Sequence, residues 1–324
     1  MFVNLDQAIQ LIQEGKILHI AADESLLSQL PKGKWIAGTT PYFITEQGGI
    51  ISKDKLFVNE IVDAVDYKTV VYDQNNIFDI TKDAYPNGIS FLVIPFASDI
   101  AAFYAKESPN SIDLLMNPTI GWISGFDLST DASAKVYDGV TGSAYGDKAV
   151  ALHISLPDNK MASLGIVNIF SADENNAIIE FTEDTLSVTK CLVNGKEVVF
   201  ADYLVENNID TQLPLVADYN SVLVNVSIKS VSEESKTVDL YAPVFAGTEY
   251  RFARPVSNYP ASFAEHLQGL KDTKPIFSCN CILNYLYGEL EGQSTPPFAG
   301  PVTFGEVAYQ LLNQTLAYVE IIDK

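Results

Sequence analysis

Short apolar runs of strand length recur along the whole chain, and they constrain its fold more than any other feature. Most are bounded by Gly, Pro, Asn, Asp or Lys, which is typical of β-strands separated by turns. Asn194-Gly195 separates two alternating arms and predicts a tight hairpin. We therefore expect a mixed α+β (α/β) protein with extensive, mostly antiparallel sheet and interspersed helices. The predicted strands include 17–22, 34–38, 55–61, 68–73, 89–96, 134–139, 149–156, 221–231, 236–245 and 249–255.

Four segments have helical character instead. Phe2, Leu5, Ile9 and Ile12 recur at helical spacing at the N-terminus. Ser98 is suited to cap a helix over 98–108. The other two predicted helices span 201–208 and 260–271, the latter with Pro at its start.

The chain is 324 residues long, a length at which a single core usually gives way to two domains. Neither a low-complexity tract nor a short-period repeat marks a boundary. The polar stretch 155–161 is the break that we choose. It predicts two halves, 1–158 and 159–324.

Composition excludes several classes of partner. Asp and Glu number 41 against 20 Lys and Arg, a net charge of -21, which opposes binding to nucleic acid or to an anionic membrane surface. The N-terminus lacks the pattern of a secretion signal, and the longest apolar runs are too short to span a bilayer as helices. Three cysteines are too few for a disulfide framework. These features predict a cytoplasmic protein.

Cys279 and Cys281 are the residues that most invite a catalytic interpretation. Cys279 at a strand-to-helix turn could act as a nucleophile, with His266 as its base, in a hydrolase or acyl transferase. The alternative is that both thiols are buried and pack as small apolar groups. No set of Cys and His at metal-ligand spacing accompanies them, so no metal site is predicted. Signatures of the common hydrolases, phosphate-binding loops and dinucleotide-binding turns are also missing, and no cofactor is expected.

Glu306 is an acidic residue in an otherwise apolar, strand-like segment, VTFGEVAY. An unpaired carboxylate is costly to bury, so Glu306 would need a partner if it faces the interior. A bound amine, a backbone N–H or an arginine could serve. If the side chain instead faces solvent, it needs none.

Three segments together resemble the C-terminal domain of FIST proteins. They are PIFSCNCILNYLYG (275–288), GPVTFGEVAY (300–309) and LLNQTLAYVEI (311–321), in the family's order of Phe-Ser-Cys, Gly-Glu and Asn-Gln-Thr. The stretch WIAGTTPYFITEQGGI (35–50) is similar to the family's N-terminal glycine-rich turn.

The resemblance implies a cytoplasmic, non-catalytic sensory protein that binds a small molecule, with an amino acid or amine as the proposed ligand class. Because no output domain is attached, a separate signalling protein would be its partner. The chain departs from the family in having no Arg after Arg254, so a ligand carboxylate would need Arg251 or Arg254 instead. The ligand-binding residues that the resemblance and the proximity of the two turns imply are Gly38, Thr39, Thr40, Tyr42, Ser278, Cys279, Gly305, Glu306, Asn313 and Gln314.

Overall fold

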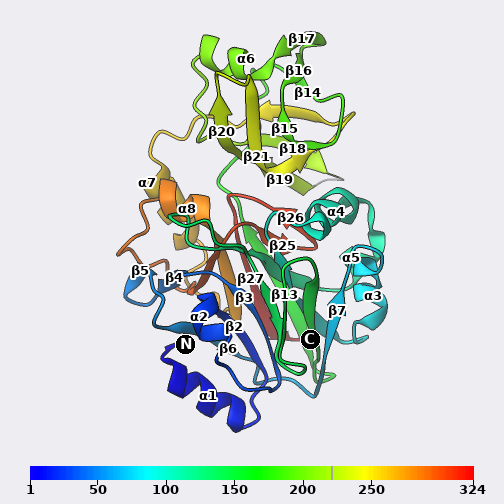
Figure 1. Ribbon diagram of the computed structural model, residues 1–324, viewed down its shortest axis with the longest axis vertical. Coiled ribbons are helices and arrows are strands. Elements are labelled where there is room, and N and C mark those ends of the chain that lie inside the picture. The colour runs from blue at the N-terminus through cyan, green and yellow to red at the C-terminus, as the bar shows by residue number, and fades with distance from the viewer. Residues whose placement is uncertain (220–221) are drawn as a thin grey trace.

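The computed structural model describes residues 1–219 and 222–324 and has the mixed α+β architecture expected from the sequence. Five mostly antiparallel sheets are interspersed with short helices. Figure 1 shows two parts: a large body (residues 1–167 and 259–324) and a smaller lobe (residues 168–258) at the top of the view. Both chain termini lie in the body, so the lobe is an insertion into it.

The first sheet of the body belongs entirely to the N-terminal half and has the order β1-β6-β2-β3-β10-β11. Its strands are β1 (Phe2–Val3), β2 (Leu18–Ala22), β3 (Trp35–Thr39), β6 (Leu56–Glu60), β10 (Val136–Asp138) and β11 (Ser143–Tyr145). Helices α1 (Leu5–Gln13) and α2 (Glu24–Leu27) accompany it. The first helix starts later than its apolar spacing predicted. Asn4 caps it, and Phe2 instead pairs with Phe57 in the sheet.

The second sheet brings the C-terminal residues into the N-terminal half, in the order β26-β25-β9-β8-β12-β7. Strand β25, which begins at Glu306, pairs antiparallel with β9, and β9 runs parallel to β8. The strands are β7 (Asp66–Tyr72), β8 (Gly88–Pro95), β9 (Thr119–Ser124), β12 (Ala149–Ser155), β25 (Glu306–Ala308) and β26 (Gln310–Leu312). Helical segments η1 (Ile77–Asp79), α3 (Ile80–Asp83), α4 (Asp99–Glu107), η2 (Ser108–Asn110) and α5 (Ile112–Met116) connect them. Ser98 caps α4, as predicted.

The third sheet, β13-β27-β23-β24-β4-β5, also mixes the two halves of the sequence. Its strands are β4 (Tyr42–Thr45), β5 (Gly48–Ile51), β13 (Lys160–Val167), β23 (Phe277–Cys281), β24 (Gly300–Thr303) and β27 (Leu316–Asp323), with helices α7 (Tyr259–Gln268) and α8 (Ile282–Tyr287) beside them. The predicted boundary at residue 158 lies between β12 and β13, and strands from both sides of it share two sheets.

The lobe combines a six-stranded sheet, β17-β16-β14-β22-β18-β19, with a three-stranded sheet, β15-β21-β20. Its elements are β14 (Ile179–Glu180), β15 (Thr185–Val188), β16 (Lys190–Val193), β17 (Lys196–Val199), α6 (Phe200–Glu206), β18 (Leu215–Tyr219), β19 (Val222–Val226), β20 (Ile228–Ser232), β21 (Thr237–Val244) and β22 (Glu249–Phe252). The predicted Asn194-Gly195 hairpin is confirmed, since both residues have positive φ and join β16 to β17.

The predicted strand 221–231 is two strands in the structure, and its first residue lies outside the described range. Strand β19 pairs with β18, whereas β20 pairs with β21 in the other sheet. Ser227 lies at the break between them. One apolar run therefore crosses from sheet to sheet, which alternation alone does not reveal.

None of the helices in the described part of the chain is both long enough and apolar enough to cross a membrane.

Candidate functional site

The side chain of Glu306 is completely buried where β25 begins. Its carboxylate accepts hydrogen bonds from the Thr303 hydroxyl (2.9 Å) and from the hydroxyl (2.7 Å) and backbone N–H (3.2 Å) of Thr315. Burial raises the pKa of Glu306 to about 8, although these hydrogen bonds and one from Cys281 act in the opposite direction. The group is therefore mostly protonated at neutral pH and offers little negative charge to a ligand.

Asn313 and Gln314, two other predicted site residues, join the body to the lobe. The Asn225 side chain donates to the backbone carbonyl of Asn313 (3.0 Å), and the Ser227 hydroxyl donates to the side-chain oxygen of Gln314 (2.6 Å). Gln314 also donates to the backbone carbonyl of Gln212 (3.1 Å). All three lobe residues thus bond to one C-terminal turn, and both Asn313 and Gln314 are buried there.

The predicted N-terminal turn lies against the strand that precedes Gly305 and Glu306. The Thr40 hydroxyl donates to the carbonyl of Val302 in β24 (2.7 Å), and β24 pairs with β4. The Thr39 hydroxyl donates to the backbone carbonyl of Gly125 (2.7 Å). The structure therefore brings the two predicted turns together, but in packed and buried positions. The turn comprises Gly38, Thr39, Thr40 and Tyr42, all buried.

Ser278 and Cys279 have little free space beside them. The cavity next to β23 measures about 10 Å³, room for about one water molecule. The Cys279 thiol donates to the carbonyl of Gly121 (3.4 Å), and Ser278 donates to the carbonyl of Ala299 (3.0 Å). A ligand would have to displace this packing to reach either side chain.

The alternative catalytic pair, Cys279 and His266, is not assembled in this structure. His266 is an exposed residue of α7, and within the described residues its ring bonds only to the carbonyl of Ser262 (2.8 Å). Cys279 is 1% exposed. The other two histidines are strand residues: His19 accepts from Trp122, and His153 bonds to Tyr72 and Ser90.

Burial raises the pKa of Cys279 and of Cys281 well above the usual range, with the nearby Glu306 carboxyl as the second cause for each. Cys191 is also buried and free.

We expect iodoacetamide at pH 8 to label all three cysteines at least about 100-fold more slowly in the native protein than in urea. Peptide mass spectrometry at timed intervals measures each rate. Rapid native labelling confined to Cys279 would instead support the nucleophile.

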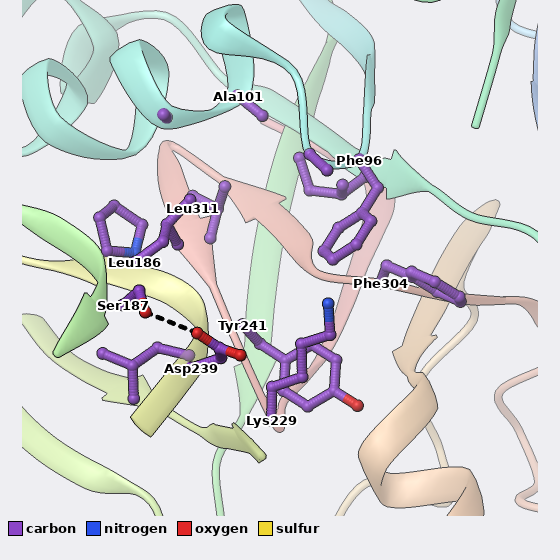
Figure 2. Close-up of a pocket in the computed structure, with 14 residues that line it drawn as sticks. Phe96, Ala101, Leu186, Ser187, Lys229, Asp239, Tyr241, Phe304 and Leu311 are labelled. Carbon is purple, nitrogen blue, oxygen red and sulfur yellow. Dashed lines mark hydrogen bonds between the residues drawn. The ribbon is translucent and has the colours of Figure 1, made fainter. Parts of the chain in front are cut away.

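A cavity that the sequence did not indicate lies between the body and the lobe and measures about 330 Å³ (Figure 2). The residues that the body contributes are Phe96, Ala97, Ala101, Ala102, Ile123, Phe304 and Leu311. The lobe contributes side chains from β15, β20 and β21. Most of the lining is apolar, with a few polar groups, which is typical of a small-molecule site.

The polar groups of this inter-lobe cavity come from the lobe. Asp239 accepts hydrogen bonds from Ser187 (2.7 Å) and Ser230 (3.0 Å), which lower its pKa, and the charge of Lys229 adds a smaller effect. The Lys229 ammonium lies 5.7 Å from the centre of the Phe96 ring and has no ion-pair partner among residues 1–219 and 222–324. Burial raises the pKa of Tyr241 to about 12, so its hydroxyl stays protonated at neutral pH. Within the described residues, no three His, Cys, Asp or Glu side chains are placed to hold a metal ion.

The pattern of the chain matches one family model, described as a family of unknown function, DUF6976, over residues 3–322. Because that match covers nearly the whole chain, the protein belongs to the DUF6976 family. No curated protein and no solved structure matches it. The resemblance to FIST proteins stays a prediction.

Proposed function

We propose that the protein is a cytoplasmic, non-catalytic small-molecule-binding protein whose ligand occupies the inter-lobe cavity. The observation that carries this proposal is the 330 Å³ cavity itself, which is largely apolar and lined from both parts of the molecule. Three free, buried cysteines are consistent with a reducing compartment.

A sensory role of the FIST kind would use the position of the lobe as its signal. A ligand in the cavity contacts both parts, so its binding energy would favour one arrangement of the lobe over others. A separate signalling protein would then respond to that arrangement. An amino acid or amine, the ligand class that the resemblance implies, would have to place its ammonium near Asp239, because Glu306 is buried and mostly neutral.

A neutral fluorescent probe tests whether the cavity binds small molecules. We expect N-phenyl-1-naphthylamine to bind saturably with increased fluorescence, because an apolar site of this size accommodates it. Ala102 lines the cavity, so Ala102→Trp should weaken probe binding at least about tenfold by filling the space.

Ala144→Trp, at an exposed position of β11, is the matched control and should bind the probe as the unaltered protein does. Thermal unfolding of both variants checks that they are folded. Equal binding by Ala102→Trp and the unaltered protein would place the probe elsewhere and contradict the proposal.

A further inference from the structure

The geometry of the inter-lobe cavity points to a specific ligand class: we infer that it binds a monocarboxylate with an aryl or alkyl body, whose carboxylate pairs with Lys229. This inference rests on the proposed function and narrows it. It concerns the charge of the ligand, which the apolar lining by itself leaves open.

The two charged residues of the cavity differ in whether their charged groups already have hydrogen-bond partners. One carboxylate oxygen of Asp239 accepts a hydrogen bond from the Ser187 hydroxyl, and the other accepts one from the Ser230 hydroxyl. Lys229 forms neither an ion pair nor a hydrogen bond within the described residues, and its ammonium lies over the ring of Phe96. Figure 2 shows this nitrogen pointing between Phe96 and Phe304. The cation is therefore the group that still lacks a direct partner.

Lys229 is one of nine lysines that form no ion pair among residues 1–219 and 222–324, and it is the one of these nine that lines the cavity. Nine other lysines form ion pairs with Asp or Glu in the described part of the chain. One unpaired ammonium matches one negative charge, and hydrogen bonds between charged groups are stronger than neutral ones. A monoanion fits this arrangement better than a dianion or a cation.

The rest of the cavity selects an apolar body for that anion. Phe96 and Phe304 pack edge to face, with ring centres 5.1 Å apart, and Leu311 and Leu240 add aliphatic surface. A carboxylate on Lys229 would leave the body of the ligand beside these side chains. Burial of that body supplies the hydrophobic part of the affinity.

A matched series of ligands separates the charge from the apolar body. We expect 3-phenylpropanoate and octanoate to displace N-phenyl-1-naphthylamine at least about tenfold more effectively than 3-phenylpropanamide or phenethylamine. Lys229→Met should remove this preference by weakening carboxylate binding about tenfold, while probe affinity stays within about twofold. Lys271→Met, an exposed lysine that does not line the cavity, is the matched control and should keep the preference.

The possible outcomes distinguish this inference from the proposal on which it rests. Probe binding that Ala102→Trp weakens, together with no preference for the carboxylates or a preference for the amine, would overturn the carboxylate assignment alone. Carboxylate binding that persists in Lys229→Met would also overturn it. Probe binding that Ala102→Trp leaves unchanged would overturn the small-molecule site as well.

Discussion

Replacing Glu306 by Gln is expected to remove a loss of stability that the unaltered protein undergoes as the pH rises from 6.5 to 8. In the folded protein the pKa of Glu306 is about 8, whereas an ordinary glutamate ionises near 4.5. Between these values the native state holds a proton that the unfolded state has released, so the free energy of unfolding falls as the pH rises. Over pH 6.5–8 this contribution is on the order of 2 kcal/mol.

The comparison should be made between the slopes of two titrations, because other groups also contribute. Burial lowers the pKa of His19 to about 3 and of His153 to about 4, so both stabilise the protein as the pH rises toward 6.5. The pKa of the Met1 amino group is also lowered by burial, which adds stability as the pH rises toward 8. These groups are common to both proteins, so the difference in slope above pH 6.5 isolates Glu306.

Urea unfolding at intervals of half a pH unit measures the effect. In Glu306→Gln the new amide keeps the shape of the protonated acid but cannot ionise. Its oxygen can accept from the hydroxyl and N–H of Thr315, and its NH2 group can donate to the Thr303 hydroxyl oxygen. Glu174→Gln makes the same substitution at an exposed position and should retain the slope of the unaltered protein. Parallel curves for Glu306→Gln and the unaltered protein would show that Glu306 is already ionised in the native state.

Local patterns in the sequence predicted the elements of this fold better than their assembly. The caps and turns are set by neighbouring residues, so Ser98 and the pair Asn194-Gly195 could be recognised directly. Phe2 has the spacing of the first helix, yet it pairs with a strand more than fifty residues away. Sheets that join 42–51 with 300–303 depend on such distant pairings, which periodicity does not encode.

The expectation for Glu306 shows why chemistry is harder to predict than local structure. The sequence predicted that a buried carboxylate would need a partner, and a bound cation was one candidate. The structure supplies two threonines and a backbone N–H, and burial shifts the equilibrium toward the neutral acid. The same residue that suggested a ligand is thereby satisfied within the protein.

The inter-lobe cavity had no signal in the sequence because its lining is gathered from distant segments. Lys229 lies in an alternating run and resembles an ordinary solvent-facing strand residue. Only the packing of β20 beside the turn after β8 brings its ammonium near Phe96. Sites built between two parts of a chain are therefore found from tertiary structure rather than from motifs.

The close approach of the backbone of β9 to that of β8, near Cys279, gives the prediction with the largest effect on stability. Gly121 lies in β9 opposite Leu92 of the parallel strand β8, in the interior of the second sheet. A Cβ atom on Gly121 would lie 1.7 Å from the carbonyl oxygen of Leu92. Backbone in the middle of a sheet cannot move aside without breaking ladder hydrogen bonds, so Gly121→Ala should cost at least about 4 kcal/mol.

Denaturant unfolding of Gly121→Ala and Gly146→Ala provides the measurement. Gly146 is exposed, and a Cβ there would have its nearest neighbour at 3.8 Å, so its substitution should change the unfolding free energy by less than about 1 kcal/mol. Because the Cys279 thiol donates to the carbonyl of Gly121, the first variant should also expose Cys279 to alkylation, and the second should not. Equal unfolding midpoints for the two variants would mean that β8 and β9 do not approach as closely as the structure describes.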